Sequence, residues 1–428
     1  MNAPSSLRRG WCPGALRPMP TGDGLLLRIR APGGRLAPEC ARAIGDCAAR
    51  FGNGTIEISS RANLQLRGIR EAGLPGLQRR LDELGLLDAD AATEGVRNIV
   101  ASPLADIDPT AILDTAPIAA ALAARLGDDA RLHGLPAKFS FLIDGGGALP
   151  LGDVEADIRF EAYLGDRGPR FAVVLAGEAE LASVCAPQDL AATAAALASA
   201  FLQGAGTAQN APRRMRELVA SNGAASVFQT AGLKPSAPPA PPRRRAAHRD
   251  FLGVHKFGAS LCVGAAPPLG RMTARDLGFL AEEARRRAAV DIRLTPWRAL
   301  LVTGLAVGDA EGLGAALARR GFILDPDDPR LAIVACAGAP ACANAARPVQ
   351  AEALEFAPWV AAGAGIALHV SGCEKGCAHG QRTPFTLVAR QSGYDLVFSG
   401  KASDEPSRRA LTKHEIAPLL AQWTGKSS

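Results

Sequence analysis

The chain has 428 residues, of which 48% are hydrophobic and 21% are charged. This balance excludes wholesale disorder, and the length is sufficient for two or more domains. The net charge of +6 is spread along the chain, and aromatic residues make up only 5% of it. A nucleic-acid partner is therefore not expected, because no dense basic tract with interleaved aromatic residues is present.

Membrane association is not expected either. The first 20 residues contain no apolar segment of the kind that a secretory signal needs. The longest Ala-rich stretch, residues 190–202, is too short to span a bilayer. Nine cysteines in such a chain do not predict a disulfide framework, so we expect a cytoplasmic protein.

The first part of the chain is predicted to form a βαββα unit followed by an open sheet. Apolar and polar residues alternate in the strands, and apolar residues recur at three- and four-residue steps in the second helix. The predicted unit comprises strand 24–31, helix 39–51, strands 55–60 and 64–69, and helix 74–84. The predicted sheet comprises strands 138–144, 157–164 and 171–177.

A segment rich in Pro and Arg, residues 234–249, predicts a semi-rigid, solvated linker. The same order of elements follows it, with Gly304 equivalent to Gly68. The second unit comprises strand 257–263, helix 273–289 with a capping box at Thr273 and Asp276, strands 291–295 and 299–305, and helix 313–320. A second sheet comprises strands 366–372, 385–390 and 394–400.

The predicted fold class is α+β, with a duplicated two-domain unit. Each half would contain a ferredoxin-like βαββα domain and a mixed α/β sheet domain. The predicted boundaries are 1–88 and 250–325 for the ferredoxin-like half-domains, 89–233 and 326–428 for the sheet domains, and 234–249 for the linker. Two unrelated α/β domains are the alternative, because similarity between short segments is easily over-interpreted.

Four of the nine cysteines form two pairs. Cys336 and Cys342 have five residues between them, and Cys373 and Cys377 have three. Each pair follows a predicted strand and is surrounded by small residues, which let the backbone approach a compact inorganic group. Four thiolates from two loops predict a 4Fe-4S cluster in the C-terminal half. A structural zinc site or inert cysteines remain as alternatives, although the wider spacing fits zinc less well.

The first half has no cysteine at the position equivalent to the Cys373 loop. This asymmetry suggests a cleft between the halves, with the cluster on one wall and basic side chains on the other. Arg61, Arg97 and Lys138 are the candidates for the basic wall, since convergent cations bind carboxylates. A solvated surface charge is the alternative for each of them.

Other basic residues are assigned no function. Arg28, Arg30 and Arg67 alternate along strands and are predicted to be surface charges. His379 follows Cys377 closely and could donate to a cluster sulfur, ligate a second metal or simply lie at the surface. His255 and His369 show no pattern that indicates a function.

Together with the cysteine pairs and the duplicated units, the segments SSRANLQLRG, RNIVASP and LPAKFSF resemble the siroheme nitrite and sulfite reductase superfamily over residues 14–425. In that superfamily four cysteines bind a 4Fe-4S cluster, and the last one bridges to the siroheme iron. The resemblance implies that Cys377 is the bridging residue, and that Arg61, Arg97 and Lys138 occupy active-site positions.

One position departs from the superfamily, which has a second Lys two residues after the first. Ser140 stands there in this chain. The missing cation should weaken the binding of a small dianion, since each close charge in a partly buried site contributes on the order of a kcal/mol.

The opening RGWCPGALRPMPTGDGLLLRIRAPGGRLAP, the Pro-rich linker and Ser140 are more similar to one branch, the precorrin-3B synthases. That similarity implies a monooxygenase of aerobic cobalamin biosynthesis, which hydroxylates precorrin-3A with dioxygen and forms a lactone. It also implies a mononuclear non-haem iron that activates oxygen, with ligands that the sequence does not identify.

Since no G-x-G-x-x-G follows a strand, we expect an external electron donor, either a ferredoxin or an NADH-dependent reductase. The main alternative function is a siroheme-dependent sulfite or nitrite reductase. An electron-transfer or tetrapyrrole-carrier protein is a third, non-catalytic alternative.

Overall fold

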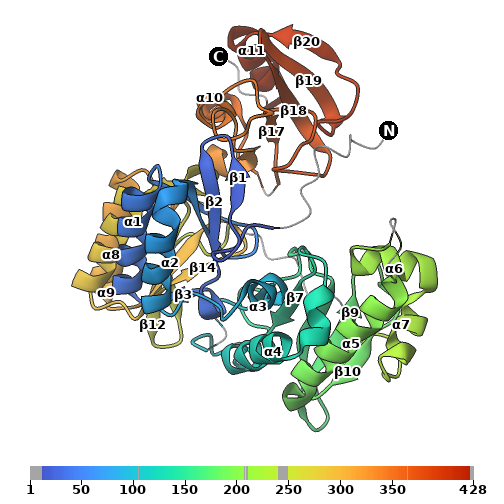
Figure 1. Ribbon diagram of the computed structural model, residues 1–428. Helices are drawn as coiled ribbons and strands as arrows, with labels where there is room; N and C mark the ends of the chain where they lie inside the picture. The colour runs from blue at the N-terminus through green and yellow to red at the C-terminus, as the bar shows by residue number, and fades with distance from the viewer. Residues whose placement is uncertain are drawn as a thin grey trace.

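The computed structural model describes residues 12–424 except 105, 207, 209–210, 240–248 and 364. Residues 1–11 of the first predicted half-domain and 240–248 of the predicted linker therefore lie outside the described residues. Within the described part, the strands form four sheets of five strands each. Figure 1 shows two of these sheets and their helices together on the left, a second body in green at the lower right, and the C-terminal body in red at the top.

The first half-domain forms where the sequence predicts it. Its helix α1 has a Pro in the first turn and an acidic residue beside it, both favourable at a helix N-terminus. The elements are β1 (Met19–Thr21), β2 (Gly24–Ile29), β3 (Arg35–Leu36), α1 (Pro38–Phe51), β4 (Thr55–Ile58), β5 (Leu64–Ile69) and α2 (Leu74–Glu83).

The second half-domain repeats this order. The predicted capping box is present, since Thr273 Oγ1 accepts from the Asp276 N–H and the Asp276 side chain accepts from the Thr273 N–H. The elements are β11 (Gly253–Phe257), β12 (Ser260–Ala265), β13 (Arg271–Thr273), α8 (Ala274–Arg286), β14 (Asp291–Leu294), β15 (Leu300–Leu305) and α9 (Val307–Arg319). The single strand predicted over 257–263 is wrong, because Gly258 adopts a positive φ of 59° and turns the chain into a hairpin.

The two half-domains exchange short strands. β3 of the first half pairs with β14 of the second, and β13 of the second half pairs with β4 of the first. The strand orders are therefore β1-β2-β5-β4-β13 and β11-β12-β15-β14-β3. Neither half can complete its sheet without the other.

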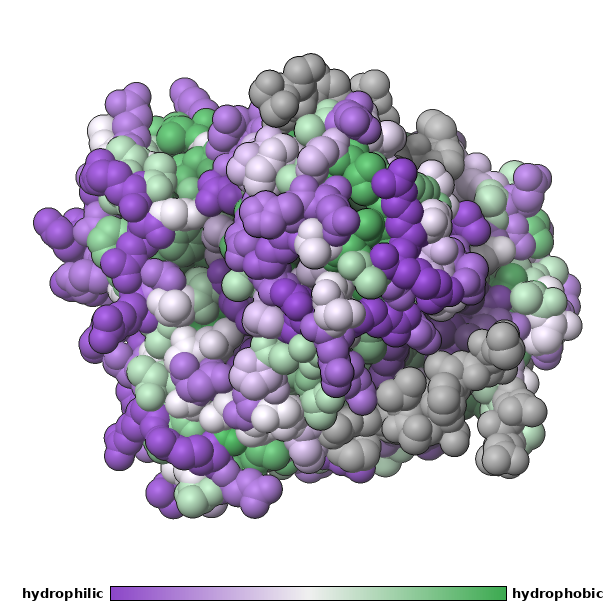
Figure 2. Space-filling model, turned by 90° about the horizontal axis from the view of Figure 1, so that it is seen from above, coloured by the Kyte–Doolittle hydropathy of each residue, from purple (hydrophilic) through white to green (hydrophobic). Residues whose placement is uncertain are grey.

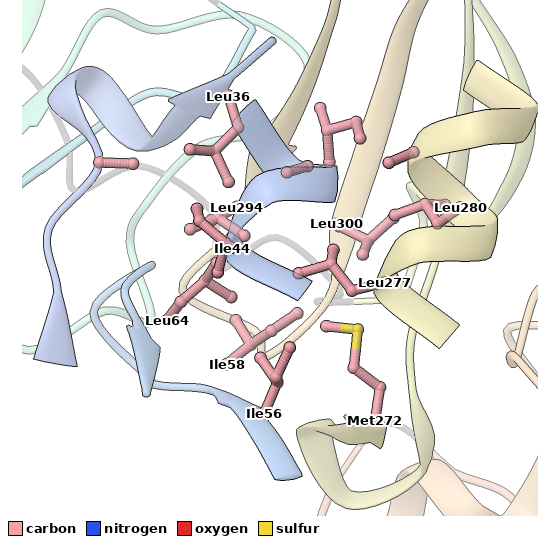
Figure 3. Close-up of a cluster of buried hydrophobic side chains, with 14 of the residues drawn as sticks. Leu36, Ile44, Ile56, Ile58, Leu64, Met272, Leu277, Leu280, Leu294 and Leu300 are labelled. Atoms are coloured by element: carbon pink, nitrogen blue, oxygen red, sulfur yellow. The ribbon is translucent and has the colours of Figure 1, made fainter. Parts of the chain in front are cut away.

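A common hydrophobic core follows from this exchange. Helices α1 and α8 pack together, and one buried cluster contains apolar residues from both halves. Figure 3 shows Ile56, Ile58 and Leu64 of the first half facing Met272 and Leu277 of the second. Leu64 and its equivalent, Leu300, are both fully buried in this cluster.

The two sheet domains share one topology, in which the first three strands are parallel and the later pairings are antiparallel. The first has α3 (Ala91–Val96), β6 (Ile99–Ala101), α4 (Ala116–Asp128), β7 (Phe141–Asp144), β8 (Ile158–Gly165), β9 (Gly168–Leu175), β10 (Ser183–Cys185), α5 (Leu190–Ala205), α6 (Met215–Asn222) and α7 (Ala224–Thr230). The second has β16 (Ile333–Ala335), α10 (Val349–Glu355), β17 (Leu368–Ser371), β18 (Thr383–Arg390), β19 (Gly393–Gly400), β20 (Arg408–Leu411) and α11 (Lys413–Thr424).

Both ends of the predicted linker form hydrogen bonds with neighbouring domains. Ser236 forms a two-way backbone bridge with Ala182 of the first sheet domain. Arg249 is only 5% exposed and donates to the Gly365 carbonyl at 3.3 Å. Lys234 and residues 236–239 are nevertheless exposed, as a solvated linker predicts. Among the described residues of the linker, only the burial of Arg249 departs from that expectation, because a neighbouring domain covers this end.

The described helices include none that is long and apolar enough to cross a membrane. Seen from above in Figure 2, hydrophilic side chains cover much of the surface, with small apolar patches between them. Scattered apolar residues of this kind are normal on a folded protein.

The shared core predicts that the two half-domains unfold as one unit. Leu64→Ala and Leu300→Ala should each lower the free energy of unfolding by about 2–5 kcal/mol, because each removes a fully buried side chain. Hydrogen exchange should then show equal loss of protection in α1 and α8 for either variant. Loss confined to the half that carries the substitution would contradict the shared core.

Candidate functional site

The four paired cysteines lie on two loops at one edge of the C-terminal sheet. β16 and β17 are parallel neighbours, with Ala335 opposite Val370. Cys336 directly follows β16, and Cys373 comes two residues after the end of β17. Because the carboxyl ends of parallel strands meet at the same edge, the pairing brings the two loops together.

A backbone hydrogen bond joins the two loops. The Gly372 N–H donates to Cys336 Sγ at 3.1 Å, and Cys336 interacts electrostatically with Cys342 and Cys373. Cys377 interacts electrostatically with the other three thiols, and none of the four is in a disulfide. The structure thus gathers the four predicted ligands around one location.

At Cys336 and Cys377 the surroundings favour the uncharged thiol. Burial raises the pKa of Cys336, against the opposing effect of the Gly372 and Gly338 N–H groups. Burial also raises the pKa of Cys377, opposed by Lys375. A cationic iron–sulfur core would reverse this balance, because ligands must lose their protons on binding.

Small residues are required by both loops. A Cβ on Gly372 would lie 2.6 Å from the Ala345 Cβ and 3.3 Å from Cys336 Sγ. Gly338 has a φ of 70°, and a Cβ there would lie 2.8 Å from the Val349 nitrogen. A side chain at Gly372 would therefore push the two cysteine loops apart, and one at Gly338 would push its loop away from Val349.

The described residues contain no group of three His, Cys, Asp or Glu side chains that could hold a single metal ion. Four free thiols on two adjoining loops are the donor set that a 4Fe-4S cluster uses, so these residues fit such a cluster.

The first sheet domain has the same two loops without the thiols. Ser102 directly follows β6, as Cys336 follows β16, and its Oγ accepts from the Gly145 N–H at 2.9 Å. Asp108 stands at the position of Cys342 and accepts from the Ala148 N–H at 2.6 Å. In the first sheet domain, Ser102 and Asp108 thus hydrogen-bond within the loops, at the positions where the C-terminal domain has Cys336 and Cys342.

Two of the three predicted basic residues line one cavity, and the third contacts Arg61 through its backbone. Arg61 Nη2 donates to the Lys138 carbonyl at 2.8 Å, and Arg61 and Arg97 line one cavity of about 280 Å³. Arg97 also forms a bidentate pair with Asp88, with N–O distances of 2.8 and 2.9 Å. Lys138 lies in a turn before β7 rather than in the predicted strand, and its side chain is exposed.

Two arginines that the sequence placed at the surface also belong to this region. Arg30 lines the same cavity and is only 5% exposed; it pairs with Glu94 at 3.1 Å, while its Nε has no hydrogen-bond partner among the described residues. Arg28 donates to Gln65 Oε1 at 2.6 Å. Burial, together with repulsion from Arg30 and Arg61, lowers the pKa of Arg28 to about 10.

The N-terminal segment closes this region from one side. The Cys12 thiol interacts electrostatically with Arg28, Arg30 and Arg61. Glu94 accepts from the Ala15 N–H at 2.5 Å and from the Leu16 N–H at 3.1 Å, which fixes the segment that follows Cys12.

Ser140, where the superfamily has its second Lys, faces a buried acid. Its N–H donates to Asp157 Oδ2 at 3.0 Å, and Asp157 is fully buried. Arg214 Nε approaches the same carboxylate at 2.9 Å. The positive charge at this place therefore comes from Arg214, the N-cap residue of α6, and Asp157 already neutralises it.

His379, a candidate donor or metal ligand by sequence, pairs with His369 beside the Cys373–Cys377 loop. The ring centroids of His369 and His379 are 5.9 Å apart. Burial, and to a lesser extent His379, lowers the pKa of His369 to about 4, so its ring is neutral. Neither ring nitrogen of His369 has a hydrogen-bond partner among the described residues.

Two family descriptions match the chain. "Nitrite/Sulfite reductase ferredoxin-like half domain" matches residues 17–84 and 255–320. "Nitrite and sulphite reductase 4Fe-4S domain" matches residues 92–235, the sheet domain whose loops carry Ser102 and Asp108. The four paired cysteines lie in the other sheet domain, which has the same strand topology.

Full-length relatives carry related names. A precorrin-3B synthase of Sinorhizobium sp is 36% identical over 410 residues, which cover 94% of this chain and 85% of the relative. A ferredoxin–nitrite reductase of Synechococcus elongatus is 27% identical and covers 90% of this chain and 81% of its own. A sulfite reductase [ferredoxin] of Mycobacterium tuberculosis is 25% identical and covers 89% and 70%.

The solved structure of Mycobacterium tuberculosis NirA protein superposes with a TM-score of 0.75 at 21% identity, over 94% of this chain and 84% of that one. Together with the family matches, it confirms the predicted α+β fold with duplicated halves.

The loop equivalence predicts the outcome of Cys336→Ser. A serine at the equivalent position, Ser102, keeps the same backbone hydrogen bond, so the variant should fold with an unchanged circular dichroism spectrum. Its iron and sulfide content and visible absorption should nevertheless fall to near zero, because a hydroxyl is a poor ligand for a cluster iron. Cys40→Ser, outside the site, is the matched control and should retain the cluster. A Cys336→Ser variant with full iron content would remove Cys336 from the ligand set.

Proposed function

The chain belongs to the nitrite and sulfite reductase superfamily, in the family of precorrin-3B synthases, and from that premise we propose that it is an oxygenase of precorrin-3A. In the proposed reaction one atom of dioxygen enters the substrate as a hydroxyl group, a lactone forms, and the second oxygen atom leaves as water. The electrons come from an external donor, and the family is one of oxidoreductases.

The observation that carries the choice of reaction is the environment of Ser140. A reductase of small oxyanions gathers cations around its substrate, whereas Ser140 and Arg214 are both engaged by the buried carboxylate of Asp157. The cations that line the wall of the cavity are Arg30, Arg35, Arg61 and Arg97, of which Arg35 pairs with Asp106. Such a wall suits several carboxylates of one large substrate better than a single small dianion.

The cavity size supports the same assignment. About 280 Å³ is enough for carboxylate side chains but small for a whole tetrapyrrole. We therefore propose that the cavity receives the acidic side chains along one edge of the macrocycle. Arg61 is the strongest candidate to bind them, since Arg97 already shares its charge with Asp88.

Cys336, Cys342, Cys373 and Cys377 would hold the cluster. A 4Fe-4S cluster bound there supplies electrons one at a time. The Gly372 N–H, already aimed at Cys336 Sγ, would stabilise the charged thiolate.

A mononuclear iron does not fit the described residues in the same way. His369 and His379 form a pair of rings, but no third His, Cys, Asp or Glu joins them. We therefore assign no ligands to such an iron and derive no step through it.

The donor would be a ferredoxin or an NADH-dependent reductase, and the names of the nitrite and sulfite reductase relatives include ferredoxin. A cytoplasmic location would suit the thiols, since none of the described cysteines is in a disulfide.

The reaction is tested with anaerobically purified protein, precorrin-3A and a reductant. Admission of dioxygen should give oxygen uptake and a product that gains one oxygen atom, traced with labelled dioxygen. Strong siroheme bands in the purified protein, with sulfite or nitrite reduction and no oxygen uptake, would favour the reductase instead. Binding of precorrin-3A without either reaction would indicate a carrier.

The cavity assignment predicts a loss of affinity in Arg61→Met. The substitution removes a charge-assisted hydrogen bond of about 1.5–3 kcal/mol, so the Kd for precorrin-3A without dioxygen should rise about 10- to 100-fold. Iron content should stay unchanged, because Arg61 is not among the cysteine loops. Arg319→Met on the exposed face of α9 is the matched control. Equal affinities of the two variants would exclude the cavity as the carboxylate site.

A further inference from the structure

The first half-domain is joined to the Cys336–Cys342 loop through one buried carbonyl. Arg67 Nη2 on β5 donates to the Ala341 oxygen at 3.0 Å. The Gly22 N–H, in the turn between β1 and β2, donates to the same oxygen at 3.2 Å. Ala341 directly precedes Cys342, so both hydrogen bonds act on the backbone beside a proposed ligand. Figure 1 shows the β1–β2 hairpin extending from its sheet toward the C-terminal domain.

The Arg67 guanidinium is itself held rigidly. Its Nε and Nη2 each lie 3.1 Å from an oxygen of Asp23, and its Nη1 lies 3.4 Å from Glu57 Oε2. Only 4% of the side chain is exposed, so water competes little for these contacts. The prediction that Arg67 is a surface charge is wrong, because its strand face is covered by the loop of another domain.

The exchanged strand completes the arrangement. Arg271 on β13 pairs with Glu57 Oε1, and Gln65 donates to Glu57 Oε2 at 3.0 Å. These residues lie opposite one another on neighbouring strands, with Arg271 facing Glu57 and Glu57 facing Gln65. Residues of both half-domains thus fix the position of the Arg67 guanidinium, which in turn holds the cysteine loop through its hydrogen bond to Ala341.

We propose that Arg67 is a positioning residue for the cluster, holding the Cys336–Cys342 loop in the shape that presents both thiolates. The proposal rests on the proposed function only in that these cysteines bind the cluster. A loop freed from Arg67 would sample other shapes, which would expose the cluster to solvent and change the surroundings of its sulfur atoms. Solvent exposure and hydrogen bonding at the sulfurs are factors that set the reduction potential of such clusters.

The duplication supplies a matched control. Arg293 on β14 is 2% exposed, donates to the Pro103 carbonyl at 2.8 Å, and pairs with Asp291 and Asp106. Arg293 thus holds the loop after β6, in which Ser102 and Asp108 stand at the positions of the cysteines. Arg293→Lys therefore disturbs a buried ion network and a domain contact like those of Arg67, but not the cysteine loop.

The test compares Arg67→Lys with Arg293→Lys in full-length protein loaded with its cluster. Lysine keeps the charge but cannot hold Asp23 and the Ala341 carbonyl together. Arg67→Lys should lose iron to a chelator about tenfold faster than wild type, and its reduced cluster should show an altered electron paramagnetic resonance signal and midpoint potential. Arg293→Lys should match wild type in all three readouts.

Gly22→Ala tests the same contact without touching the ion network. An alanine Cβ would lie 2.2 Å from the Pro340 carbonyl oxygen, so it must displace the hairpin or the loop. Gly22→Ala should accelerate iron loss as Arg67→Lys does. If Arg67→Lys fails to fold, the result for Gly22→Ala alone tests the proposal.

The proposal is overturned if Gly22→Ala, and Arg67→Lys where it folds, keep wild-type spectra and iron loss, or if Arg293→Lys loses iron equally fast. Wild-type protein that never acquires a cluster would instead refute the proposed function, together with any role for Arg67 in it.

Discussion

The parallel pairing of neighbouring strands is the constraint on which the site depends. β16 and β17 end at the same edge of their sheet, so two loops that are distant in sequence start side by side. The Gly372 N–H then reaches Cys336 Sγ across the gap. Any shift in the register of these strands would separate the cysteine pairs, and the duplicated domain builds the same edge from β6 and β7.

The duplication shows how one scaffold serves two purposes. At the equivalent edges, the same backbone N–H meets the Ser102 hydroxyl in one domain and the Cys336 thiol in the other. The hydroxyl lies 3.3 Å from Asp144, which accepts its hydrogen bond, and Asp108 closes the neighbouring loop, so the first edge is internally satisfied. The thiols do not have an equivalent set of hydrogen bonds within the described part of their loops, and bonds to the irons of a cluster would take their place. The difference between the domains is thus one of side-chain chemistry on a common backbone.

The sequence predicts the elements with strong periodicity and the residues with a chemical signature. The cysteine pairs, the Thr273 cap and the repeated βαββα order all have local signals. The exchanged strands do not, because β3 and β13 are too short for a pattern of alternation. The burial of Arg30 and Arg67 is also hidden, since an alternating strand predicts only that one face is polar. Which domain covers that face depends on tertiary contacts from residues far along the chain, such as Glu94 and Ala341.

Neighbouring arginines repel one another, which destabilises the fold. Carboxylates compensate this repulsion at some of the arginines but not at others. Asp88 neutralises Arg97 and Glu94 pairs with Arg30, whereas Arg28 donates to the neutral Gln65 and to the Cys12 thiol. Burial and like charges accordingly lower the pKa of Arg28 and of Arg61. An anion that entered the cavity would offset this repulsion. Because the arginines are already in place, the cavity would favour acidic ligands. Since β2 and β5 carry both Arg28 and Arg67, one sheet connects the cationic cavity to the loop that presents the cysteines.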